Sequence, residues 1–141
     1  MGSTIELSTS QIQELYQLAR AAREKAYCPY SGYQVGAAIR VAEGKIYTGC
    51  NVENSSYGAT NCAERVAIQK AISEQGRVQI WAVMVVTDAS PPWPPCGMCR
   101  QVIAEFSQDC VIYAANLQGE LQTTRFAELL PQAFTPQYLT A

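Results

Sequence analysis

A nearly continuous apolar run at residues 80–87, which ends at Asp88, limits the folds that this chain can adopt. A strand with one solvated face alternates apolar and polar residues, so an unbroken run is typical of a strand buried on both faces. The sheet that contains this strand must therefore be covered on two sides. The helices that can provide this cover are predicted over 8–26, 62–75 and 97–106. Ser8, followed by Gln11, is a typical cap for the first of them.

Four other segments are predicted to be strands, and they are 35–41, 45–51, 111–115 and 120–124. The first two form a hairpin, with Glu43 and Gly44 at its turn. Shorter helical pieces are predicted near 126–130 and 136–139. Because strands and helices alternate, we predict an α/β fold in which helices cover both faces of the sheet. No linker or repeat divides the 141 residues, so 1–141 is predicted to be a single domain.

Composition excludes several classes of protein. With 48% hydrophobic and 16% charged residues, the chain is not intrinsically disordered. Its formal net charge is −2 and it has no run of Lys or Arg, so a nucleic-acid partner is not expected. No apolar stretch approaches the roughly 18 residues of a membrane span, and the N-terminus lacks the basic-then-apolar order of a signal peptide. We therefore expect a soluble, cytoplasmic protein.

The chain contains no histidine, which excludes imidazole as a catalytic base or a metal ligand. Acid–base chemistry must then come from carboxylates, Lys, Tyr or Cys, and a transition-metal site from thiolates or carboxylates. The six cysteines are too few for a disulfide-rich scaffold, and without an export signal they are expected to be reduced.

Three of these cysteines stand where predicted helices begin. Cys62 opens one helix in the sequence Cys-Ala-Glu-Arg, while Cys96 and Cys99 open another in Pro-Cys-Gly-Met-Cys-Arg. The positive end of a helix favours thiolates, and a spacing of three lets Cys96 and Cys99 face one point. If the two helix starts are neighbours, three thiolates converge. Three protein ligands leave a fourth position on Zn²⁺ for water, which is the catalytic pattern.

A single Cys-x-x-Cys pair has two other interpretations, a structural zinc half-site and a redox pair. The second pair that a closed four-cysteine site requires is missing. The redox motif is expected after the first strand of a thioredoxin-like unit, not after a proline-rich loop late in the chain. Glu64, two residues after Cys62, favours catalysis, because a carboxylate beside a metal-bound water is the general acid–base of metal-assisted hydrolysis.

Longer motifs extend this pattern along the chain. They are Tyr-Cys-Pro-Tyr-Ser-Gly-Tyr-Gln-Val-Gly-Ala-Ala from Tyr27, Gly-Cys-Asn-Val-Glu-Asn-Ser-Ser-Tyr from Gly49, Cys-Gly-Met-Cys-Arg-Gln-Val from Cys96 and Glu-Leu-Leu-Pro-Gln-Ala-Phe from Glu128. In this order they resemble the motifs of the homotetrameric cytidine deaminases over roughly residues 8–135. The core also matches the zinc-deaminase signature in its three-cysteine form, with Cys62 where other members carry histidine.

The resemblance implies a three-layer α-β-α sandwich around a mixed sheet of about five strands. It implies one zinc per chain on Cys62, Cys96 and Cys99, with Glu64 carrying protons. The implied reaction is hydrolytic deamination of cytidine and 2′-deoxycytidine to uridine and 2′-deoxyuridine plus ammonia, a step of pyrimidine salvage. In it, a zinc-activated water attacks C4 of the base.

The resemblance also assigns contacts with the nucleoside. Asn51 and Glu53, on either side of Val52, match residues that hydrogen-bond the ribose hydroxyls, and Ala63 offers its backbone to the pyrimidine. Two residues apart on an extended segment, the Asn and Glu side chains share one face.

Aromatic residues complete the site that the resemblance implies. Tyr33 stands where the family often has a Phe that stacks on the base, and a tyrosine keeps that ring face. Tyr57 and Phe134 match aromatic residues that reach a neighbouring subunit's pocket, which implies a homotetramer. The segment Pro91–Pro95, which contains Trp93, departs from the family pattern.

Other residues near the motifs have simpler interpretations. Three thiolates leave a zinc centre with a formal charge of −1, and Arg65 could offset this charge by hydrogen bonds to the sulfurs, with Arg100 as the alternative donor. The residues expected to fill space rather than bind metal or substrate are Cys28, Cys50, Cys110, Trp81 and Met84.

Two functions compete with deamination of ordinary cytidine. One is deamination of a modified cytosine nucleoside, such as a nucleoside antibiotic, and the Asn51 and Glu53 pair favours an ordinary ribose instead. The other is a zinc-binding module without activity, against which Glu64 and the open coordination position argue.

Overall fold

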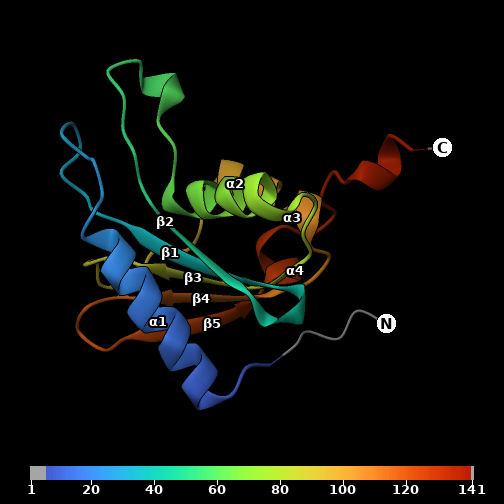
Figure 1. The fold of residues 1–141 in the computed structure, drawn as a ribbon, viewed down its shortest axis with the longest axis horizontal. Helices are drawn as coiled ribbons and strands as arrows, with labels where there is room; N and C mark the ends of the chain where they lie inside the picture. The colour runs from blue at the N-terminus through green and yellow to red at the C-terminus, as the bar shows by residue number, and fades with distance from the viewer. Residues whose placement is uncertain (1–5, 141) are drawn as a thin grey trace.

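A mixed sheet of five strands forms the middle layer of the molecule, in a computed structural model that describes residues 6–140 (Figure 1). The strands are β1 (Gly36–Val41), β2 (Ile46–Cys50), β3 (Ile80–Val86), β4 (Val111–Ala115) and β5 (Leu121–Arg125). Their order is β2-β1-β3-β4-β5; β3 and β4 are parallel, and the other neighbours are antiparallel. The predicted mixed sheet is confirmed. Residues 1–5 and 141, the ends of the predicted domain, lie outside the described residues.

Helices cover both faces of this sheet, as predicted (Figure 1). They are α1 (Thr9–Arg23) on one face and α2 (Ala63–Gln75), α3 (Gly97–Phe106) and the short α4 (Phe126–Leu129) on the other. Leu15 of α1 shares a buried cluster with Met84 of β3. On the opposite face, Ile68 of α2 and Ile103 of α3 share a second cluster with Val83 of β3. The α-β-α sandwich is confirmed. No helix in residues 6–140 has the length and apolar character needed to cross a membrane.

The first helix has the cap that its sequence predicts. The Gln11 backbone N–H donates to the Ser8 hydroxyl at 3.2 Å, and the Ser8 N–H donates to the Gln11 side chain at 2.9 Å. The helix ends at Arg23, short of the predicted residue 26. The hairpin turn is also confirmed, as the single turn η1 (Ala42–Gly44), in which Glu43 and Gly44 have positive φ angles.

Trp81 does not belong to the buried core, which corrects the prediction for this residue. Val41 pairs with Ile80 and Arg40 pairs with Ala82, so Trp81 is an extra residue in β3 opposite β1. Such a bulge interrupts the regular alternation of side chains between the two faces of the sheet. Trp81 is consequently half-buried, whereas Met84, farther along β3, is completely buried as predicted.

Gly49 in β2 brings the start of α2 close to the sheet. A Cβ atom at Gly49 would lie 2.6 Å from both the Ala63 carbonyl oxygen and the Ala67 nitrogen. Any side chain here would therefore push α2 away from β2. This close approach holds the first turn of α2, which carries the candidate site residues Ala63, Glu64 and Arg65, on the end of the β hairpin.

Candidate active site

Three cysteine sulfurs converge where α2 and α3 begin. Cys62 is the N-cap of α2, Cys96 is the N-cap of α3, and Cys99 lies in the first turn of α3. The three sulfur atoms all lie within 4.8 Å of one another, and those of Cys62 and Cys96 are 3.6 Å apart. The two helix starts are therefore neighbours, which is the arrangement that sequence spacing alone left conditional.

The geometry and chemistry of these three thiols fit a zinc ion. Sulfurs bound to one zinc at about 2.3 Å in a tetrahedron lie about 3.8 Å apart, close to the separation of the Cys62 and Cys96 sulfurs. All six cysteines are free thiols, so no disulfide competes for the cluster. Within residues 6–140 this is also the one group of three or more metal-ligating side chains close enough to share an ion. Cys28, Cys50 and Cys110 lie outside it, as predicted.

Arg65 supplies positive charge to the cluster. Its Nη2 donates a hydrogen bond to the Cys62 sulfur at 3.3 Å. Hydrogen bonds from the Cys99 thiol and then from Arg65 hold the pKa of Cys62 well below its ordinary value. The pKa of Cys99 is raised, because its thiol donates to Cys62 and is itself desolvated. One thiolate therefore forms readily, whereas a second or third thiolate at the cluster needs a cation to stabilise its charge.

Arg100, the alternative donor, has other partners. Its Nε donates to the Pro95 carbonyl oxygen at 2.8 Å, and its Nη1 donates to the Leu129 carbonyl oxygen at 2.9 Å. These bonds tie the start of α3 to the end of α4. The contacts thus favour Arg65 over Arg100 as the residue that offsets the charge of the sulfurs.

We expect Arg65→Gln to fold normally and to lower kcat about tenfold, the scale on which residues behind metal ligands act. Removing a positive charge raises the pKa of every acid nearby, so the acidic limb of the pH–rate profile should move to higher pH. The comparison is with Lys70→Gln, which neutralises an exposed lysine on the same helix. A zinc-loaded Arg65→Gln protein with the kcat and pH profile of the parent would contradict this assignment.

Glu64 belongs to the first turn of α2, and its charge interacts with those of Cys62 and Cys99. The residue is only 4% exposed, and this burial raises the pKa of Glu64 to about 7, with a smaller contribution in the same direction from the charge of Cys62. A carboxyl group that titrates near neutrality can both accept and return a proton at neutral pH. Glu64 therefore has the environment expected of a general acid–base.

The candidate sugar-binding residues brace a loop in this structure. Asn51 Oδ1 accepts from the Val35 N–H at 2.9 Å, and Asn51 Nδ2 donates to the Tyr33 carbonyl oxygen at 2.7 Å. The Glu53 carboxylate accepts from the backbone N–H groups of residues 30 and 31 and from the Ser31 hydroxyl, and these bonds, led by the one from Ser31, lower its pKa. The motif predicted neither set of partners.

The segment 51–53 nevertheless lies beside the metal ligands. Val52 exchanges backbone hydrogen bonds with Asn61, at 3.0 Å and 2.9 Å, and Asn61 directly precedes Cys62. Ala63, the residue after Cys62, is completely buried. The pairing therefore carries the candidate sugar-binding side chains to the start of α2.

The predicted aromatic residues lie on exposed loops. Tyr33 packs edge-on against Trp93, with ring centroids 5.2 Å apart. Tyr57, in the short turn η2 (Tyr57–Ala59), is exposed. Phe134 is also exposed, and its ring stacks on that of Tyr138 in the short turn η3 (Pro136–Tyr138). The contact of Tyr33 with Trp93 joins loops 60 residues apart, and no sequence pattern signals it.

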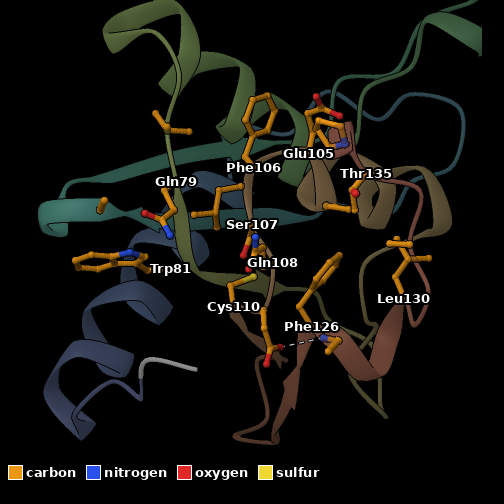
Figure 2. Close-up of a pocket in the computed structure, with 18 of the residues that line it drawn as sticks. Gln79, Trp81, Glu105, Phe106, Ser107, Gln108, Cys110, Phe126, Leu130 and Thr135 are labelled. Atoms are coloured by element: carbon orange, nitrogen blue, oxygen red, sulfur yellow. Dashed lines mark hydrogen bonds between the residues drawn. The ribbon is translucent and has the colours of Figure 1, made fainter. Parts of the chain in front are cut away.

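The surface also has a wide hollow of about 1070 Å³, and none of the three cysteines of the sulfur cluster lines it. Figure 2 shows this hollow. Its walls come from the C-terminal ends of α2 and α3, the start of β3 and the segment after α4. Trp81, Phe106, Cys110, Phe126 and Leu130 are among its lining residues. Since the sulfur ligands belong to the opposite ends of α2 and α3, we assign this hollow no part in the chemistry.

Comparison with known proteins agrees with this geometry. A family model for the cytidine and deoxycytidylate deaminase zinc-binding region matches residues 9–115. Cytidine deaminase from Halalkalibacterium halodurans is 52% identical over 126 residues, which span 89% of this chain and 95% of that protein. The crystal structure of cytidine deaminase from Burkholderia pseudomallei is 42% identical, with a TM-score of 0.82, and the match covers 91% of this chain and 100% of that one.

The fold and the three-sulfur centre thus define a zinc-binding α/β protein of the deaminase class. The chain belongs to the cytidine and deoxycytidylate deaminase family. Its cofactor is one zinc ion, for which the cluster of Cys62, Cys96 and Cys99 is the site. A more distant relative is blasticidin-S deaminase from Bacillus cereus, 32% identical over 133 residues, which span 87% of this chain and 94% of that protein.

Proposed function

We propose that this chain, acting as one domain, catalyses the zinc-dependent hydrolytic deamination of cytidine and 2′-deoxycytidine. The products are uridine or 2′-deoxyuridine and ammonia. The observation that carries the proposal is the buried Glu64 carboxyl group, whose charge interacts with those of Cys62 and Cys99 in the cluster of three convergent thiols. The family match and the identity to cytidine deaminases over most of the chain support the same reaction.

The residues at the start of α2 and α3 have separate roles in this reaction. Zinc, when bound, supplies the positive charge that makes a water nucleophilic near neutral pH. Glu64 takes one proton from this water and delivers it to ring nitrogen N3. It then takes the remaining proton from the hydroxyl group now on C4 and passes it to the amino group, which leaves as ammonia while the C4 carbonyl forms. Arg65, at the Cys62 sulfur, offsets the charge of the thiolates. Burial of Glu64 keeps competing solvent away from these proton transfers.

The direct test is incubation of the purified, zinc-loaded protein with cytidine. The expected result is a loss of cytidine absorbance with equal amounts of uridine and ammonia formed. A protein that contains zinc but leaves cytidine unchanged would contradict the proposal and favour a zinc-binding module without activity.

The alternative function is deamination of a modified cytosine nucleoside, because the chain is also related to blasticidin-S deaminase. A higher kcat/KM for blasticidin S than for cytidine would support this alternative. The identity of 52% to a cytidine deaminase, against 32% to blasticidin-S deaminase, favours cytidine.

Asn51 and Glu53 are proposed to bind the sugar, and Glu53→Ala tests this role. Loss of a hydrogen bond to a charged group costs roughly 1.5–3 kcal/mol, so we expect kcat/KM for cytidine to fall about 10- to 100-fold. Because Glu53 also braces residues 30 and 31, free cytosine serves as the control. If Glu53→Ala only disorders the loop, kcat/KM should fall equally for cytidine and for free cytosine. If Glu53 binds the sugar, kcat/KM should fall for cytidine alone. A parent protein that uses cytosine as well as cytidine would contradict the assignment.

A homotetramer completes the proposal. Tyr57 and Phe134 are exposed here, and large exposed aromatic side chains are typical of protein–protein contacts. We expect sedimentation to show a closed, symmetric oligomer of four chains, and Tyr57→Ala to weaken both assembly and activity. A fully active monomer at micromolar concentration would contradict it. The six free thiols fit a cytoplasmic location, where cysteines stay reduced.

A further inference from the structure

We propose that Trp93 is a positioning residue, which holds the ring of Tyr33 and thereby sets where the pyrimidine base binds. The inference rests on the proposed deaminase function. The two rings pack edge-to-face, with centroids 5.2 Å apart and planes at 70°. This geometry is one that aromatic pairs prefer, since the positive edge of one ring meets the negative face of the other.

The backbone around Trp93 is held at both ends. The Ala89 carbonyl oxygen accepts from Nδ2 of the completely buried Asn116 at 3.0 Å. At the other end, the Pro95 carbonyl oxygen accepts from Arg100 Nε at 2.8 Å. Four prolines stand between residues 90 and 96 and fix their own φ angles. Trp93 therefore projects from a stiff, anchored segment and can restrain a neighbouring side chain.

The other ring belongs to a loop that the site itself anchors. The Tyr33 carbonyl oxygen accepts from Asn51 Nδ2 at 2.7 Å, and the Tyr33 N–H donates to the Ser31 hydroxyl at 3.1 Å. Trp93 stands three residues before Cys96, a metal ligand. The aromatic pair thus connects the segment before the metal site with the candidate sugar-binding residues.

Both rings remain accessible despite this anchoring. Tyr33 is 61% exposed and Trp93 is 41% exposed, whereas Pro92 and Pro95, before and after Trp93 in the chain, are buried. An exposed tyrosine that is free to rotate must be ordered when a base stacks on it, and this costs conformational entropy. Contact with Trp93 reduces that cost before the nucleoside arrives. Trp93 should therefore act on nucleoside binding and not on the chemical step.

Steady-state kinetics with cytidine tests this division. We expect Trp93→Ala to raise KM about 3- to 10-fold, the scale of an aromatic pair, with kcat within about twofold of the parent. Trp93→Phe, which keeps a ring, should restore most of the affinity. Trp81→Phe, which changes the tryptophan in the distant hollow of Figure 2, should match the parent. An unchanged KM in Trp93→Ala, or a loss of kcat alone, would overturn the inference.

Fluorescence gives a second test that does not depend on turnover or on the folding of Trp93→Ala. The chain has two tryptophans, so Trp93 is the one that remains in the Trp81→Phe protein. Titration of this zinc-loaded protein with uridine should produce a saturable change in tryptophan emission, and the same titration of Trp93→Phe should produce none. If the Trp81→Phe protein deaminates cytidine but its tryptophan emission does not change with uridine, this inference alone is overturned. A protein that does not deaminate cytidine would overturn the proposed function.

Discussion

Replacing Glu64 with glutamine should lower kcat for cytidine by a factor of roughly 10²–10⁴, the usual contribution of a general acid–base. Glutamine has nearly the same shape as glutamate but cannot accept the proton from water. It also cannot protonate the departing amino group, so two proton transfers fail together. The zinc content should stay at one per chain, because Glu64 is not one of the three sulfur ligands.

Glu74→Gln is the matched control, since this glutamate is exposed on the same helix. It removes the same charge from α2 without touching the site and should leave kcat unchanged. Turnover within a few fold of the parent in a zinc-loaded Glu64→Gln protein would rule out this residue as the proton carrier.

The second large effect is expected from the metal ligands. A protein with both Cys62→Ala and Cys96→Ala retains only one of the three thiols, so we expect its zinc content to fall from one per chain to near zero. Deaminase activity should disappear with the metal. Metal analysis of the purified protein and its cytidine turnover measure the two losses on one sample.

Single replacements of the other cysteines separate ligand loss from a general effect of removing thiols. Cys28→Ser, Cys50→Ser and Cys110→Ser should each keep a full complement of zinc, because these residues lie outside the cluster. Cys110 is buried, so its replacement costs some stability without affecting the metal. Full zinc occupancy in the double variant would show that the ligand set is wrong.

Much of the fold follows from local patterns that a single sequence contains. The unbroken apolar run of β3 predicts a strand covered on both faces, and the buried clusters on its two sides confirm it. Trp81 shows where such a pattern fails. Its place in the core depends on how β3 pairs with β1, and the extra residue in that pairing is a property of two strands together. No local pattern predicts a bulge of this kind.

The site likewise has features that local sequence predicts and features that depend on contacts between distant segments. The Cys-x-x-Cys spacing and the helix starts predict that Cys96 and Cys99 face one point. Cys62, also predicted as a ligand, joins them only if α2 and α3 begin side by side, and the structure shows that they do. The hydrogen bonds of Asn51 to the Tyr33 loop could not be predicted, since they arise when β2 folds back beside that loop. The contact of Tyr33 with Trp93 likewise depends on the packing of two loops far apart in the chain.

Zinc content and cytidine turnover, measured on the same protein during stepwise removal and return of the metal, test the central claim most directly. The three-sulfur site predicts one zinc per chain, uridine formation that falls in proportion to the zinc removed, and recovery when zinc is returned. Undiminished uridine formation by protein without zinc would contradict the claim, and so would a protein with one zinc per chain that leaves cytidine unchanged.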